Sequence, residues 1–175
     1  MIKKSSELIG KPVILQREKA VVGLVKSFVI DPETGELVGL LVLEGFGSRN
    51  LKSLAIKDVT TITKEYFLIG SYENLGELDE IVRIKKVLDK KIGINKCNVY
   101  TVSGKFLGRV KDFSINLTFM RLEKIFVDSL WIISTARHYI ISFNQIISIE
   151  PGKIIVEDAT VSKKKSVLEE VAEAS

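Results

Sequence analysis

Gly23-Leu-Val-Lys-Ser-Phe-Val-Ile-Asp31 occurs a second time in the same chain, as Gly108-Arg-Val-Lys-Asp-Phe-Ser-Ile-Asn116. The Gly, Val, Lys, Phe and Ile of the two stretches are identical in register at an offset of 85 residues. After a slip of two positions, the segment from Ile56 to Ile62 corresponds to the segment from Phe143 to Ile149. A period this long describes a whole domain rather than one unit of a solenoid. The sequence therefore predicts two copies of one small domain.

Each copy has the pattern of a β-barrel built from short strands. Apolar side chains occur on both faces of the segment from Val25 to Ile30, which is typical of a barrel strand. The stretch from Asp31 to Glu36 has a proline and a glycine at positions that favour a hairpin turn. Each copy of the repeated strand begins at a glycine, which indicates a bulge or a sharp bend. We expect about six strands in the first copy, near residues 11–16, 21–30, 37–43, 52–56, 59–62 and 66–69, with counterparts from 94–101 to 153–157.

The segment between the copies has the pattern of an amphipathic helix. Within residues 77–91, acidic side chains occupy the first turn and lysines the last, as the helix dipole favours. Apolar side chains recur every three or four positions on one face; they are Leu78, Ile81, Ile84, Leu88 and Ile92. The predicted organisation is a first barrel at residues 1–73, a helical linker at 74–91, a second barrel at 92–157 and a charged tail at 158–175, which is helical or disordered.

The composition is that of an ordinary globular protein. The 175 residues are 46% hydrophobic and 27% charged, which provides enough apolar material for a core. No apolar run approaches the roughly 20 residues that cross a bilayer, and the first residues lack the apolar stretch of a signal peptide. We therefore expect a cytoplasmic location without a transmembrane segment. The positive charge is uneven, because residues 77–156 carry 13 basic and 8 acidic side chains.

The residue types that carry chemistry are scarce. The single cysteine, Cys97, excludes an intramolecular disulfide, and its apolar neighbours predict a small buried hydrophobe. One cysteine and one histidine, His138, are too few for a structural zinc site, which draws on four ligands. The sequence contains no nucleophile elbow and no phosphate-binding loop. We therefore expect no catalytic, cofactor-binding or metal-binding site, and a protein that is not an enzyme.

The shared residues resemble those of the PRC-barrel family. The resemblance rests on Leu8-Ile-Gly-Lys-Pro-Val13, on the repeated Gly-x-Val-Lys-x-Phe-x-Ile strand and on a closing Ile-x-x-Val-x-x-Ile, and it covers about residues 5–157. It implies a mainly β fold of two tandem PRC-type barrels joined by a helical linker. Two settings of this fold are the cytoplasmic part of the photosynthetic reaction-centre H subunit and the C-terminal domain of the small-subunit ribosome maturation factor.

In both settings the barrel docks onto a larger assembly and is not an enzyme. The present chain departs from the first in lacking an N-terminal transmembrane helix. It departs from the second in having another PRC-like copy where the maturation factor has a different barrel. Neither specific function is transferred, because a fold and the site grafted on it are separate questions.

A cluster of basic side chains is the first candidate for a binding surface. Its members are Arg83, Lys85, Lys86, Lys90, Lys91 and Arg109. Such a cluster can contact the phosphates of RNA or another anionic surface. The alternative is that lysines simply coat the exposed face of the linker helix. Aromatic residues are only 7% of the chain and none interleave with the cluster, so no platform for stacking bases is evident, and neither is any DNA specificity.

Apolar residues at two loops of the second copy are the second candidate. The polar turn from Asp31 to Glu36 corresponds to a turn that carries large apolar side chains, and the loop after the next strand is apolar as well. Large apolar groups at loop tips indicate a covered surface. They are buried either within the chain, against the first copy or the linker helix, or by a partner. The candidates are Leu117, Phe119, Met120, Trp131 and Ile132.

The sequence favours a non-enzymatic adaptor or scaffold that binds a protein partner or a second copy of the chain. The alternative is a ribosome- or RNA-associated processing or assembly factor that uses the basic cluster. A ligand-binding barrel is the weakest reading, because a barrel this small fills its interior with its own side chains. Both remaining readings place the working surface within residues 83–139.

Overall fold

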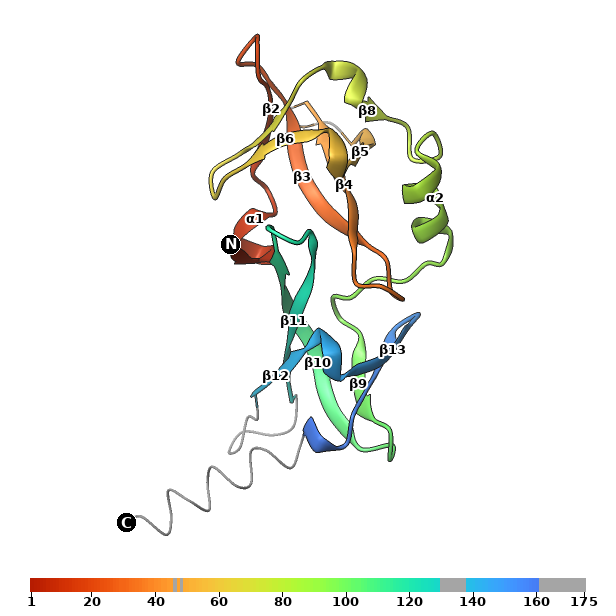
Figure 1. The fold of residues 1–175 in the computed structure, drawn as a ribbon. Coiled ribbons are helices and arrows are strands. Elements are labelled where there is room, and N and C mark those ends of the chain that lie inside the picture. Colours follow the sequence, from red (N-terminus) through yellow and green to blue (C-terminus); the bar gives the residue numbers. More distant parts are fainter. Residues whose placement is uncertain (46, 48, 130–137, 161–175) are drawn as a thin grey trace, which may run out of the picture. The chain divides into compact units, whose positions relative to one another are not determined.

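A computed structural model of the chain describes residues 1–45, 47, 49–129 and 138–160. The described elements are mostly strands, and they form two sheets (Figure 1). Their contacts divide the chain into two compact units, which we call unit 1 and unit 2. Unit 1 contains Met1–Ile92 together with Phe113–Glu123, and unit 2 contains Gly93–Asp112 and the residues from Lys124 onward. The units therefore do not follow chain order, because residues 113–123 of the second copy belong to unit 1.

The first copy contains the six strands that the sequence predicts, each within one residue of its expected bounds. These are β2 (Pro12–Leu15), β3 (Val21–Ile30), β4 (Leu37–Glu44), β5 (Leu51–Ala55), β6 (Val59–Ile62) and β7 (Phe67–Ile69). Four short elements were not predicted: β1 (Ile2–Lys4), α1 (Ser5–Leu8), and the 3-10 turns η1 (Ile56–Asp58) and η2 (Tyr72–Asn74).

The second copy repeats the first element by element. Its strands are β9 (Asn98–Thr101), β10 (Phe106–Asn116), β11 (Arg121–Asp128), β12 (His138–Ser142), β13 (Ile146–Glu150) and β14 (Lys153–Val156), with the 3-10 turn η3 (Phe143–Gln145) between β12 and β13. The sheet order β6-β7-β2-β3-β4-β5 in the first copy becomes β13-β14-β9-β10-β11-β12 in the second. In each copy, the first of the six strands pairs in parallel with the last, β2 with β7 and β9 with β14. The duplication and the mainly β fold are confirmed.

The glycines of the repeated strand, Gly23 and Gly108, lie where the backbones of two strands approach each other closely. A Cβ at Gly23 would lie 2.4 Å from the carbonyl oxygen of Leu43, and a Cβ at Gly108 would lie 2.1 Å from the carbonyl oxygen of Asp128. Gly108 also has a φ of 137° and adjoins a bulge in the pairing of β10 with β9. The strands bend here at a separation that excludes a side chain, so the predicted role of both glycines is confirmed.

The hairpin between β3 and β4 forms at the predicted turn. The amide of Asp31 donates to the carbonyl of Glu36 at 2.8 Å, and the amide of Gly35 donates to the carbonyl of Asp31 at 2.8 Å. The Asp31 carboxylate also accepts from the amide of Glu33 at 2.9 Å. Gly35 has a φ of 72°, the left-handed conformation that glycine adopts without strain.

Aliphatic side chains form the interior of each unit. In unit 1 the side chains that are at most 1% exposed include Leu8, Val13, Val25, Leu37, Leu40, Val42, Leu54, Phe67 and Ile69. In unit 2 the equivalent positions hold Val99, Ile125, Val127, Ile141, Ile154 and Val156, all at 0%. Because most of these strands contribute every second residue, the interior follows the period of two that the sequence shows.

The linker helix is shorter than predicted. It spans α2 (Val82–Asp89) instead of residues 77–91, and its first turn contains no acidic residue. The chain begins this segment as a two-residue strand, β8 (Leu75–Gly76), which pairs with β5. Residues 77–81 then turn, with the amide of Glu77 donating to the Glu80 carboxylate at 2.7 Å. The first residue of the predicted helix is held against β5, because the Glu77 carbonyl accepts from the Ser53 hydroxyl at 2.7 Å, and the helix begins only at Val82.

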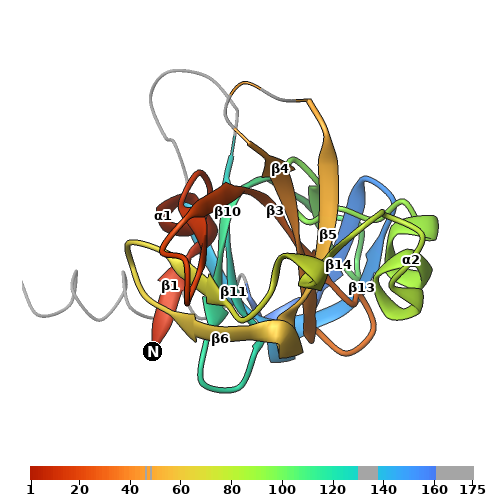
Figure 2. The same cartoon turned by 90° about the horizontal axis from the view of Figure 1, so that it is seen from above.

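The apolar face of α2 packs on unit 1, beside β3 and β4 (Figures 1 and 2). Ile84 and Val87 are buried among Val29 and Val38, and Ile81 and Leu88 are half-buried at the margin. A Cβ at Gly39 would lie 2.4 Å from Cδ1 of Ile84, so the helix sits directly on the backbone of β4. In the described ranges, no helix is long and apolar enough to cross a membrane.

Candidate functional site

The tip of the β10–β11 hairpin, residues 116–121, is tied into unit 1 by backbone hydrogen bonds. The Leu37 amide donates to the Met120 carbonyl at 2.8 Å, and the Leu122 amide donates to the Gly35 carbonyl at 2.7 Å. Strand β1 pairs antiparallel with the end of β10, from Ile2 opposite Asn116 to Lys4 opposite Ser114. Within unit 1, the hairpin tip is therefore a built-in part of the structure rather than a free loop.

The three apolar residues of this tip differ in how far their side chains are exposed. Leu117 is 7% exposed and its amide donates to the Met1 carbonyl at 2.8 Å, so its side chain is covered within unit 1 and is not available to a partner. Met120 is half-buried and has a φ of 48°, where the first copy has Gly35. Phe119 is 72% exposed. Of these three residues, Phe119 has the most exposed side chain. The other two apolar candidates, Trp131 and Ile132, lie outside the described residues.

Acidic side chains form ion pairs with three of the six members of the basic cluster. Arg83 forms an ion pair with Glu36, Lys90 with Glu33 at 2.6 Å and Lys85 with Asp89 at 2.9 Å. The hydrogen bond to Glu33 raises the pKa of Lys90, and the hydrogen bond to Asp89 raises that of Lys85. Two of these acids belong to the turn between β3 and β4, which contacts the linker only in the folded chain.

The remaining cluster members are dispersed. Lys86 and Lys91 are exposed on the linker in unit 1. Arg109 lies on β10 in unit 2, where its Nε donates to the side-chain oxygen of Asn98 at 2.9 Å. Since half of the positive charge is neutralised locally, the cluster presents a weaker attraction for phosphate than its sequence indicates.

Asp128 contacts a histidine and a lysine at the end of β11. Its carboxylate lies 2.7 Å from Nδ1 of His138 and 3.2 Å from Nζ of Lys111. The hydrogen bond from His138, followed by that from Lys111, lowers the pKa of the Asp128 carboxyl below its usual range. The charged form of Asp128 is therefore favoured in the folded state.

We expect Asp128→Asn to lower the stability of the protein at neutral pH, with a loss that shrinks in acid. A carboxyl whose pKa falls on folding stabilises the fold above its unfolded pKa, and this stabilisation is lost as the pH falls through the folded value. The thermal midpoints of wild type and variant should therefore converge below about pH 4, where an ordinary aspartate titrates. Glu18→Gln, in the exposed turn at residues 16–20, is the control. A difference between wild type and Asp128→Asn that does not depend on pH would contradict this reading.

Cys97 is buried, as the sequence predicts. It is 2% exposed, and its thiol donates to the Gly93 carbonyl at 2.7 Å. Burial raises the pKa of the thiol, which keeps it protonated and unreactive. Cys97 lies one residue before β9 and fills the interior of unit 2.

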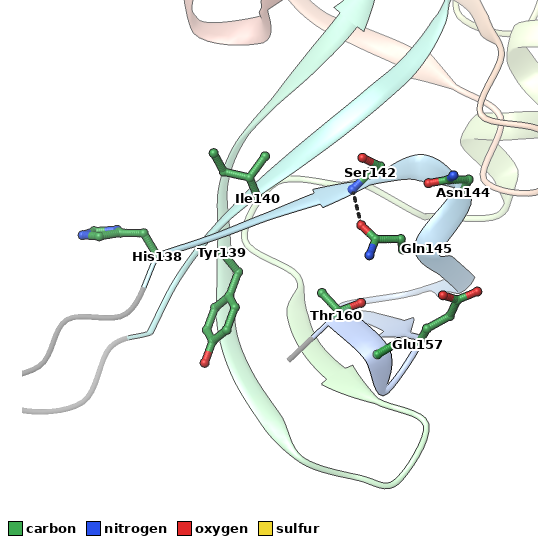
Figure 3. A pocket seen from close by; sticks show the side chains of 9 residues that line it. His138, Tyr139, Ile140, Ser142, Asn144, Gln145, Glu157 and Thr160 are labelled. Carbon is green, nitrogen blue, oxygen red and sulfur yellow. Dashed lines mark hydrogen bonds between the residues drawn. The ribbon is translucent and has the colours of Figure 1, made fainter. Parts of the chain in front are cut away.

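A hollow of about 680 Å³ lies beside β12 in unit 2 (Figure 3). Ile140 and Tyr139 point to opposite sides of the strand, and Thr160 and Glu157 lie on the side of Tyr139 (Figure 3). Ile140 is 63% exposed, whereas Tyr139 is 7% exposed. The Thr160 hydroxyl is buried and has no hydrogen-bond partner in the described part of the chain. The hollow thus combines an exposed aliphatic side chain with a polar atom that lacks a partner.

Sequence reasoning did not identify this hollow. Ile140 fits the residue pattern of an ordinary strand, and Thr160 lies at the start of the predicted tail. Neither residue is therefore unusual by itself. The available signal was the alignment of the copies, since Ile140 corresponds to Ser53 at the offset of 87 residues that relates β12 to β5. In the described residues, no group of three or more His, Cys, Asp or Glu side chains is placed to hold a metal ion.

Comparison with known families agrees with the repeated strand order. The family model of the PRC-barrel domain matches the chain twice, at residues 2–70 and 94–162. No curated protein sequence matches the chain. The two family matches cover most of the sequence and coincide with the two sets of six strands. The chain therefore belongs to the PRC-barrel domain family and carries two tandem copies of the domain.

Proposed function

We propose that this protein is a non-enzymatic adaptor or scaffold that binds a protein partner, and that Phe119 is a contact residue. The observation that carries the proposal is the 72% exposure of an aromatic side chain at the tip of an otherwise anchored hairpin. Its neighbour Leu117 is buried, and the backbone around it is held by the pairing of β1 with β10. A rigidly presented aromatic side chain loses little conformational entropy when a partner covers it.

A second feature favours a protein over an RNA partner. Two further exposed apolar side chains lie at the start of the paired strand β1 and directly before it, Ile2 at 51% and Met1 at 54%. By contrast, Arg83, Lys85 and Lys90 are engaged by carboxylates. Nucleic-acid affinity depends on cations that are free to displace counterions. Association with RNA or ribosomal particles therefore remains the alternative, carried by Lys86, Lys91 and Arg109.

Replacing Phe119 by serine is expected to weaken partner binding at least tenfold without unfolding the protein. Loss of an exposed aromatic contact at the centre of an interface costs about 2 kcal/mol or more, or at least tenfold in affinity. Tagged full-length wild type and Phe119→Ser are purified from the native cell, with and without nuclease, and the bound proteins are quantified by mass spectrometry. The thermal midpoint should change little, because an exposed side chain contributes little to folding.

Val102→Ser is the matched control, since Val102 is also apolar and 61% exposed but lies in unit 2. It should retain the partner. Sedimentation of the purified wild type and Phe119→Ser shows whether the partner is a second copy of the chain. Recovery of ribosomal particles that nuclease removes, together with unchanged binding by Phe119→Ser, would reject the proposal in favour of the RNA alternative.

A further inference from the structure

In the first copy, the outer edge of β5 is covered by β8. Ser53 pairs with Gly76 and Leu54 pairs with Leu75 in antiparallel register. The Ser53 hydroxyl donates to the Glu77 carbonyl at 2.7 Å, and Ser53 is 0% exposed as a result. Leu75 is 8% exposed and extends the interior of the barrel past its sixth strand. The first copy thus shows that this edge of the domain pairs with a short antiparallel strand.

In the second copy, the equivalent edge belongs to β12, which stands at the end of its sheet order. Ser53 and Leu54 correspond to Ile140 and Ile141. Among the described residues, no strand takes the place of β8 on this edge. The exposure at the outward-facing position therefore rises from 0% at Ser53 to 63% at Ile140. An edge strand with an exposed aliphatic side chain is a template for the addition of another strand.

The hollow beside β12 has the features that such a strand requires. It runs along the edge from Ile140 to Ser142 and reaches Thr160 on the other side. The Thr160 hydroxyl at this hollow is buried and lacks a partner within the described ranges. Ile141 is 0% exposed, so a side chain directly opposite it would extend the interior, as Leu75 does opposite Leu54.

We propose that the edge of β12 binds an extended segment of a partner protein by antiparallel strand addition. The segment places a branched aliphatic residue opposite Ile141 and a second apolar residue opposite Ile140. This inference deepens the proposed function, on which its biological meaning rests, but it concerns a surface in unit 2 that is separate from Phe119. Main-chain hydrogen bonds supply the affinity in this mode of binding, and the two apolar positions supply the specificity.

By sequence, residues 161–164 are less suited to pair with the edge of β12 than a segment of a partner protein is. In the first copy, Asn74-Leu-Gly-Glu77 provides the aliphatic residue, the glycine and the acid that pairs with Lys52. The residues in register in the second copy are Val161-Ser-Lys-Lys164, with serine in place of the aliphatic residue and lysine in place of the glycine and the acid. Lysine is a residue that edge strands use to prevent pairing.

Peptide selection on the purified full-length chain tests the proposal. A phage-displayed library of random dodecapeptides is panned on the immobilised protein, and an enriched peptide is synthesised with a fluorophore and titrated by anisotropy. We expect enriched sequences with two apolar residues in succession. Hydrogen exchange of the Ile140 amide should slow when the peptide is added, because strand addition protects the backbone amides that face the edge. The Ser142 amide already donates to the side-chain oxygen of Gln145 at 3.0 Å, so it should change little.

Ile140→Lys should weaken the peptide about tenfold or more, because a charged side chain on the edge opposes pairing. Ile147→Lys is the matched control, since Ile147 is 59% exposed on β13, at the opposite end of the same sheet order, and its affinity should remain within about twofold of wild type. Ile140 is already exposed, so its substitution should leave the fold intact, which the thermal midpoint checks.

Three outcomes would overturn the proposal. They are the absence of any enriched peptide, an equal effect of the two lysine variants, and protection that appears away from β12. If the Ile140 amide is already protected in the free chain and no peptide binds, the chain covers its own edge. The peptide affinity is measured without the cellular partner. The two proposals can therefore fail separately. Partner binding that does not depend on Phe119 would contradict the proposed adaptor function, whereas the peptide results test the edge of β12 alone.

Discussion

Replacing Gly108 by alanine is expected to destabilise unit 2 by about 4 kcal/mol, the largest effect that we predict for a single added methyl group. The new Cβ would lie 2.1 Å from the Asp128 carbonyl oxygen and 2.8 Å from the Ser129 amide nitrogen. These are backbone atoms, so relief requires β10 and β11 to separate. In addition, the φ of 137° is a conformation that residues with a side chain rarely adopt.

Urea denaturation of wild type and variant, followed by circular dichroism, measures this loss. Gly152→Ala is the matched control in the same unit. Gly152 also has a positive φ, 73°, but a Cβ there would have no neighbour within 4 Å. The control should therefore cost only the backbone strain, about 1 kcal/mol. Equal losses for the two variants would mean that the close approach of β10 and β11 is not what requires glycine at position 108.

Ile84→Ala is expected to destabilise unit 1 by about 3 kcal/mol. Ile84 is 0% exposed and packs against Val29 and Val38, with its Cδ1 over the backbone of Gly39. Removing its outer carbons leaves a cavity that rigid strands on one side cannot fill. Because Ile84 is the most buried residue of α2, the helix should also lose its docking on the sheet.

Val82→Ala on the same helix is the control for helix propensity. Val82 is 65% exposed, so its replacement should change the free energy of unfolding by less than about 0.5 kcal/mol. Urea denaturation gives the stability, and hydrogen exchange of residues 82–89 reports the docking of α2 directly. Similar results for the two variants would show that the packing of α2 does not stabilise unit 1.

The barrel strands could be predicted from the sequence because each of them is specified locally. The alternation along β3, the turn at Asp31–Glu36 and the glycines at bends all act over a few residues. The segment after β7 shows the opposite case. Residues 77–91 have a helical pattern, but β8 pairs with β5 and the Glu77 carbonyl accepts from the Ser53 hydroxyl of β5. Residues 77–81 therefore turn, and the helix begins only at Val82. Long-range pairing overrode the local pattern.

The candidate sites depended on contacts that no local pattern contains. Leu117 and Phe119 are both large apolar residues of one turn, yet one is 7% and the other 72% exposed. The difference arises because β1 and the turn between β3 and β4 hold the hairpin tip within unit 1. In the same way, Glu33 and Glu36 reach Lys90 and Arg83 across more than 40 positions of sequence.

The sequence by itself determined that the chain is a duplicated PRC-barrel protein. Short-range periodicity, turn residues and self-similarity specify the strands of each copy and the glycines at their bends. Only the tertiary structure decided which surfaces remain open. It buried Leu117 and paired half of the basic cluster with acids, and among the described residues it placed no strand on the edge of β12 like the one that covers β5. The physical reason is that exposure and charge neutralisation depend on which distant residues meet, and the two copies share a fold but not those neighbours.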